Sequence, residues 1–148
     1  MPPDPALHPD FLRGIALFNE GDYFQCHEVL EELWKQVHGD ERTFYHALIQ
    51  AAVTVYHWSR GNLVGVRGLH QHCIEKLDQL PPRHRGIDLA RLHRDLDRFV
   101  AAVERDPAQP GDLPRLHPAP DAPVRVRAML DRPTMPLRWP GESTSKTG

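Results

Sequence analysis

Two side chains able to bind a metal or move a proton, His27 and Glu31, lie four residues apart in the segment DYFQCHEVLEELWKQV. A helix turns by about 100° per residue, so residues four apart are neighbours on its surface. An imidazole and a carboxylate placed in this way can converge on one divalent metal ion, and the carboxylate can equally orient the imidazole for acid–base work. The spacing has little specificity alone, because many helices carry such a pair as a surface ion pair.

A second polar group interrupts the apolar segment ERTFYHALIQAAVTVYHWSRG. Its members His46, Gln50 and His57 fall within about 40° of one another on a helical wheel. A helix this apolar is predicted to be the buried centre of its domain, where an unpaired polar group costs about 1–3 kcal/mol. In an antiparallel hairpin residues 27–31 lie opposite residues 50–57. We therefore expect His27 and Glu31 to meet Gln50 and His57.

These residues predict a metal centre with His27, Glu31 and His57 as ligands. The residues expected around it are Gln50, His46, Trp34, Tyr23 and Glu28. Two imidazoles and a carboxylate accept Zn, Mn, Fe or Ni, so the ion is one divalent metal of unspecified identity. Three protein ligands leave an open coordination position, which makes a metal-dependent hydrolase the expected activity class. Two alternatives remain open at this point: a buried hydrogen-bond network and a metal-free acid–base site.

Helix-start and helix-stop residues predict five helices, at about residues 10–19, 22–38, 41–60, 62–80 and 87–105. The expected N-caps are Asp10, Asp22, Asp40 and Asn62. The glycines expected to end helices are Gly21, Gly39 and Gly61. Pro81 and Pro82 interrupt the pattern before the fifth helix. Because the junctions are short, we expect neighbouring helices to pack antiparallel. The predicted fold is all-α, a compact bundle of about five helices built from helical hairpins.

The C-terminal part has a different composition, since nine of the 15 prolines follow residue 106. Proline at this density excludes helix interiors and central strands. We predict a helical domain over residues 1–106 and an extended Pro-rich arm over 107–148. Apolar residues such as Leu137 and Trp139 favour docking of residues 113–140 on the body over disorder, while the last eight residues form a loose end.

Composition restricts the classes of partner. The 148 residues carry a net charge of −2, which gives no overall attraction to nucleic acid or to anionic membranes. No apolar run approaches the roughly 18 residues of a membrane span. The N-terminal residues lack the pattern of a secretory signal, and the two cysteines form no metal-type pair. We expect a cytoplasmic protein without nucleic-acid or membrane partners.

A second function class is compatible with the same sequence. Helical hairpins with exposed aromatic side chains also form non-catalytic modules that bind another protein or a second copy of the same chain. In that case the His, Glu and Gln cluster is a structural hydrogen-bond network. The metal content of protein purified without a His tag and its oligomeric state distinguish this class from the metal centre.

The segments FNEGDYFQCHEVLEELW and LIQAAVTVYHWSRGN resemble the bacterial and archaeal domain-of-unknown-function family 309 over about residues 11–80. The family signature H-x-x-x-E-x-x-W/Y is met by His27, Glu31 and Trp34. The resemblance implies an all-helical fold and a metal-binding role for the His and Glu, with no established activity. Gln25 and Cys26 depart from the Glu-Ala that the family often carries, and the Pro-rich arm lies outside the resemblance.

Overall fold

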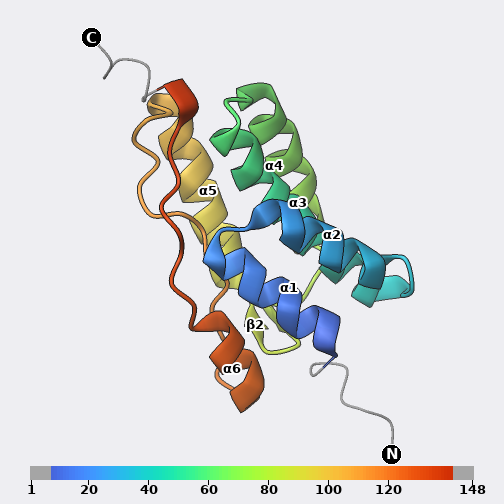
Figure 1. The fold of residues 1–148 in the computed structure, drawn as a ribbon. Coiled ribbons are helices and arrows are strands. Elements are labelled where there is room, and N and C mark those ends of the chain that lie inside the picture. The colour runs from blue at the N-terminus through green and yellow to red at the C-terminus, as the bar shows by residue number, and fades with distance from the viewer. Residues whose placement is uncertain (1–7, 142–148) are drawn as a thin grey trace, which may run out of the picture.

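The computed structural model describes residues 8–141, which form six helices and one short hairpin (Figure 1). The helices are α1 (Pro9–Glu20), α2 (Tyr23–Trp34), α3 (Gly39–Ser59), α4 (Leu63–Leu77), α5 (Leu89–Arg105) and α6 (Val124–Leu130). The antiparallel strands β1 (Arg83–His84) and β2 (Ile87–Asp88) lie between α4 and α5. The predicted all-α class and its five body helices are confirmed. The sixth helix was not predicted.

Local signals explain the ends of these helices. Asp22 and Asn62 cap α2 and α4, with their side-chain oxygens accepting from Gln25 N at 3.3 Å and Gly65 N at 2.8 Å. Gly21 ends α1 in the left-handed conformation, φ 87°, which glycine adopts without steric cost. Asp10 and Asp40 were expected as caps but lie inside the first turns of α1 and α3, where a carboxylate still favours the helix dipole.

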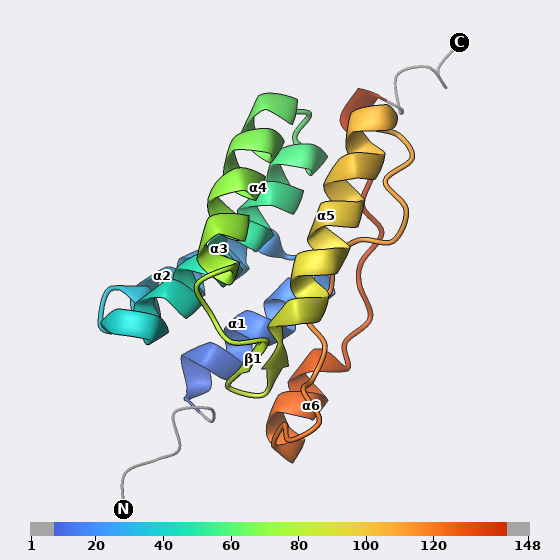
Figure 2. The same cartoon turned by 180° about the vertical axis from the view of Figure 1, so that it is seen from behind.

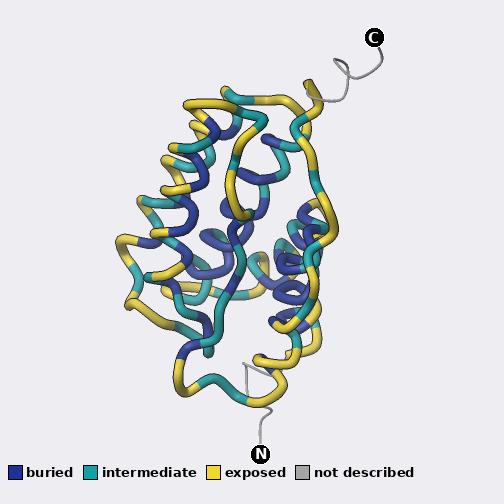
Figure 3. The backbone as a smooth tube through the Cα atoms, turned by 90° about the vertical axis from the view of Figure 1, so that its left-hand side faces the viewer, coloured by how far each residue is buried: buried dark blue, intermediate teal, exposed yellow. Residues whose placement is uncertain are grey.

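The core is centred on α3, which packs against α2 on one side and α4 on the other. In turn α2 packs on α1, and α5 packs on α4, so the layers follow chain order (Figure 2). Large side chains fill the centre and are fully buried: Phe11, Phe18, Phe44, Trp58 and Phe99. Buried positions recur along the inward side of each helix in Figure 3, as amphipathic helices require.

The residues after α5 run back along the body to α6 and then return toward the end of α5 (Figure 1). Leu116, Val126 and Leu130 are buried, and Leu137 and Trp139 are partly buried against the core. The arm was expected to be extended, but VRVRAML forms α6 because it is a proline-free run that follows Pro123. Residues 142–148 lie outside the described part of the chain. No helix within residues 8–141 is long and apolar enough to cross a membrane.

Candidate functional site

His27 and Glu31 are neighbours on the outer side of α2, as their spacing predicts. His27 Nε2 lies 3.1 Å from Glu31 Oε2, and both side chains are partly exposed to solvent. The second carboxylate oxygen of Glu31 lies 3.9 Å from Lys35 Nζ. Solvent screening makes each of these contacts a weak contributor to folding stability. The arrangement therefore offers an accessible imidazole–carboxylate pair rather than a buried structural ion pair.

His57 does not join this pair and is directed toward α4. Its Nδ1 lies 3.3 Å from Asn62 Nδ2, and a Cβ built at Gly65 would lie 2.7 Å from His57 Cγ. Tyr56, the residue before His57, is the one that contacts α2: its ring centroid lies 5.9 Å from that of Phe24. Successive helical residues differ by about 100°, so the side chain after Tyr56 is turned away from α2. Burial lowers the pKa of His57.

The three predicted metal ligands are consequently not gathered at one point. Within residues 8–141, no group of three or more His, Cys, Asp or Glu side chains is placed so that it could hold a metal ion. Only two of the predicted ligands, His27 and Glu31, lie together. Sequence spacing predicts neighbours within one helix, but the rotation of α3 about its own axis decides which of its residues face α2.

His46 lies beside Trp34, as expected, with ring centroids 5.1 Å apart. The Arg42 guanidinium stacks over the same indole at 3.9 Å and donates to the Trp34 carbonyl at 3.3 Å. Burial lowers the pKa of His46, and the positive charges of Lys76, Arg42 and His72 lower it further. The end of α3 near His46 is thus a basic environment that adjoins both α2 and α4.

The remaining predicted residues serve packing or solvation. Tyr23 is buried edge-on against Phe18, 5.7 Å between centroids, and burial raises its pKa. Gln50 is buried, and its Oε1 has no hydrogen-bond partner among the described residues. The hydrogen-bond network that we weighed from the sequence therefore does not include this atom. Glu28 is exposed and, with Glu31, borders a polar hollow between α1 and α2.

A row of aromatic and imidazole rings along the seam of α2 and α3 was missed from the sequence. Phe24 is 47% exposed, and its ring centroid lies 6.0 Å from that of His27 and 5.9 Å from that of Tyr56. At the other end of the seam, the rings of Trp34 and His46 form a second pair. We call Phe24, His27, Trp34, His46 and Tyr56 the ring face. The sequence contained a signal for it: Phe24, His27, Glu31 and Trp34 recur at spacings of three and four, outside the buried stripe of α2.

Comparison with known proteins gives a family but no activity. Residues 11–69 match the family model described as Domain of unknown function (DUF309). Uncharacterized protein YpuF of Bacillus subtilis (strain 168) is 40% identical over 101 residues, which are 67% of this chain and 55% of that protein. An uncharacterized protein of Aquifex aeolicus (strain VF5) is 27% identical over 88 residues, 59% of this chain and 26% of that protein. The chain thus spans about half of the length of the first relative and about a quarter of the length of the second.

Proposed function

We propose that this chain, whose residues 11–69 belong to the DUF309 family, is a non-catalytic helical module that associates with a second copy of itself through the ring face. The observation that carries the proposal is the exposed Phe24 ring at the junction of two helices, in contact with both His27 and Tyr56. Aromatic side chains at the centre of a surface patch supply much of the binding free energy in protein interfaces.

The choice of a second copy rests on the distribution of charge around the ring face. On α2 the carboxylates Glu28, Glu31 and Glu32 outnumber the single cation Lys35. On α4, at the other side of α3, the cations Arg67 and Lys76 outnumber the single carboxylate Glu75. A surface that carries both signs side by side is complementary to itself after a two-fold rotation.

A two-fold axis parallel to α3 meets this requirement. Because α2 and α4 border α3 on its two sides, rotation about such an axis lays the acidic α2 of one copy over the basic α4 of the other. The same rotation places His46 and Tyr56 of the two α3 helices near the centre. It lays Phe24, His27 and Trp34 of each α2 over α4 of the other copy. The polar edges then set the register, and the aromatic rings contribute most of the affinity.

Sedimentation equilibrium of the whole chain tests this proposal. The wild-type protein should sediment as a dimer at micromolar concentration, and Phe24→Ser should raise the dimer dissociation constant by at least about tenfold. Val124→Ser is the matched control, because Val124 is 81% exposed on α6, which packs on α1 and lies outside the proposed interface. A monomeric wild-type protein, or equal effects of the two substitutions, would contradict the proposal.

One observation favours a second candidate function, the binding of a divalent metal ion. The 3.1 Å separation of His27 Nε2 and Glu31 Oε2 gives two adjacent ligands on one helical turn. A site of two protein ligands leaves the other coordination positions to water or substrate, which is the condition for the metal-dependent hydrolysis expected from the sequence. Zn, Mn, Fe and Ni all accept this pair.

Elemental analysis and zinc titration of tag-free protein separate the two candidates. If the pair binds metal, Glu31→Gln should abolish uptake, because an amide is a much poorer ligand than a carboxylate. Glu32→Gln is the control, since Glu32 lies on the same helix and pairs with Lys35 rather than with His27. Metal uptake that is unchanged in Glu31→Gln would rule out this pair, whereas a dimer that persists in a chelator would leave the self-association proposal intact.

A further inference from the structure

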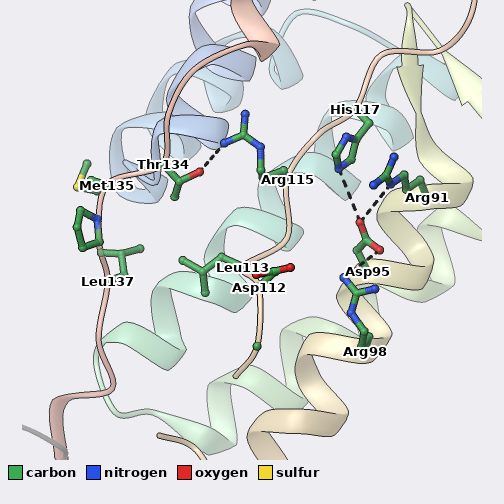
Figure 4. A pocket seen from close by; sticks show the side chains of 12 residues that line it. Arg91, Asp95, Arg98, Asp112, Leu113, Arg115, His117, Thr134, Met135 and Leu137 are labelled. Carbon is green, nitrogen blue, oxygen red and sulfur yellow. Dashed lines mark hydrogen bonds and ion pairs between the residues drawn. The ribbon is translucent and has the colours of Figure 1, made fainter. Parts of the chain in front are cut away.

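A pocket with a volume of about 440 Å³ lies between α5 and the C-terminal arm, on residues that do not belong to the ring face. Figure 4 shows the segment 111–117 running between α5 on one side and residues 134–137 on the other. The arm residues Met135, Pro136 and Leu137 supply an apolar wall, and Leu113 adds to it. The opposite wall is charged.

Asp95 organises the charged wall from α5. Its side chain is only 11% exposed and lies 3.2 Å from Arg98 Nη2 and 3.7 Å from Arg91 Nε. His117 Nε2 lies 3.9 Å from the same carboxylate. A guanidinium carries five N–H donors, so Arg91 and Arg98 each keep donors beyond the nitrogen that contacts Asp95. The carboxylate thus holds two exposed guanidinium groups at the edge of the pocket.

Arg115 adds a third guanidinium, and its position is fixed by neutral oxygen atoms. Its nitrogens donate to the Leu130 carbonyl at 2.9 Å, the Asn19 carbonyl at 3.2 Å and Thr134 Oγ1 at 2.5 Å. None of the carboxylates in the described part of the chain forms an ion pair with it. Its positive charge therefore remains uncompensated by direct contact in a partly buried position, which favours an anion nearby.

The charges of the lining residues indicate the size of that anion's charge. Arg91, Arg98 and Arg115 face Asp95 and Asp112, which leaves one net positive charge. Burial lowers the pKa of His117, and Arg91 and Arg115 lower it further against the opposing effect of Asp95 and Asp88, so this imidazole is neutral at pH 7. One net charge matches a monoanion better than a phosphate dianion, which would also be repelled by the two carboxylates.

We propose that this pocket binds a small carboxylate with an apolar body. The carboxylate group is held by the guanidinium groups of Arg91 and Arg98, and the apolar body packs against Leu113, Met135 and Leu137. Arg115, which Figure 4 shows directed toward Thr134, adds positive charge from the other side of the segment 111–117. Arginine suits this task because its planar fork of donors matches both oxygens of a carboxylate. The volume accommodates a molecule of about the size of benzoate with room for substituents, in the range of small-ligand sites.

The test is a titration of the isotopically labelled full chain with sodium benzoate, followed by the backbone amide signals of residues 111–113 and 115–117. We expect saturable shifts with a dissociation constant on the order of millimolar, as is usual for so small a ligand. Benzamide has the same shape without the charge and should bind at least about tenfold more weakly. Inorganic phosphate should also bind more weakly than benzoate.

Substitutions at the edge of the pocket provide an independent measurement. Arg91→Gln combined with Arg98→Gln should weaken benzoate binding by at least about tenfold. Arg94→Gln is the matched control, because Arg94 is exposed on the same helix and does not line this pocket. Equal binding of benzamide and benzoate by the wild-type chain would overturn the proposal whether or not the variants fold. Tighter binding of phosphate than of benzoate, or an equal loss in Arg94→Gln, would overturn it as well.

Discussion

The side-chain amide of Asn19 in α1 forms two hydrogen bonds with the backbone of Leu116 in the C-terminal arm, 97 residues away in the sequence. Leu116 N donates to Asn19 Oδ1 at 2.7 Å, and Asn19 Nδ2 donates to the Leu116 carbonyl at 2.9 Å. The same amide nitrogen donates to the Leu130 carbonyl at 2.8 Å. Asn19 is fully buried, and its side chain is the hydrogen-bond partner of both backbone groups of Leu116, while the Leu130 carbonyl also accepts from Arg115. This side chain attaches the arm to the helical body.

The first prediction concerns this attachment. Asn19→Leu should lower the free energy of unfolding by about 2 kcal/mol or more, because the two buried backbone groups of Leu116 lose their partners at about 1–3 kcal/mol each. Urea denaturation followed by circular dichroism measures the loss. Gln25→Leu is a suitable control, since Gln25 is exposed and its side chain forms no such contacts in the described structure. A loss below about 1 kcal/mol would mean that the arm is not held by Asn19.

The docking of α6 is the subject of the second prediction. Leu130 is 3% exposed, whereas Val124 at the start of the same helix is 81% exposed. Leu130→Ala should cost about 2–4 kcal/mol through lost burial and the cavity left behind, and Val124→Ala should change stability by less than about 0.5 kcal/mol. Thermal unfolding of the two variants gives the comparison. Similar small effects at both positions would show that α6 does not pack on α1.

Two glycines of α4 give the third prediction. A Cβ at Gly65 would lie 2.6 Å from Asn62 Nδ2 and 2.7 Å from His57 Cγ, while a Cβ at Gly68 would have nothing within 4 Å. Gly65→Ala should therefore destabilise the protein by about 1–3 kcal/mol, through displacement of the Asn62 cap and the His57 ring. Gly68→Ala should stabilise it by about 0.5–1 kcal/mol, because alanine favours an exposed helical position. Chemical denaturation would refute this prediction if both changes had the same sign.

The fourth prediction is a pH dependence at His46. Its pKa is lowered from the usual 6.5 by burial and by Lys76, Arg42 and His72, so the unfolded chain binds a proton more readily than the folded one. The contribution to stability is complete above pH 6.5 and is lost as the pH falls below that value toward the lowered folded pKa. His46→Gln removes this titration.

The measurement for His46 is the free energy of unfolding between pH 7.5 and pH 5, the interval in which an imidazole titrates. The wild-type protein should lose more stability over this interval than His46→Gln does. Gln71→Ala, an exposed change on α4, should keep the wild-type dependence. Parallel curves for the wild-type protein and His46→Gln would show that His46 titrates alike in the folded and unfolded chain.

Local features of this protein were determined by the sequence alone. The apolar periodicity predicted the five body helices, and Asp22, Gly21 and Asn62 marked their ends correctly, because capping and left-handed turns depend on a few adjacent residues. The contact of His27 with Glu31 was predictable for the same reason, since one helical turn sets it. The family was identified from the segments that include these residues, and the match over residues 11–69 confirms it.

Tertiary packing decided the features that join separate elements. His57 was expected beside His27, but the rotation of α3 between α2 and α4 directs it toward Gly65 and presents Tyr56 to α2 instead. The attachment of the arm through Asn19 joins residues 97 apart, a pairing that no local pattern encodes. Helical periodicity fixes which side chains share a face of one helix. Which faces meet depends on how all the helices fill the core together, and only the folded chain determines that.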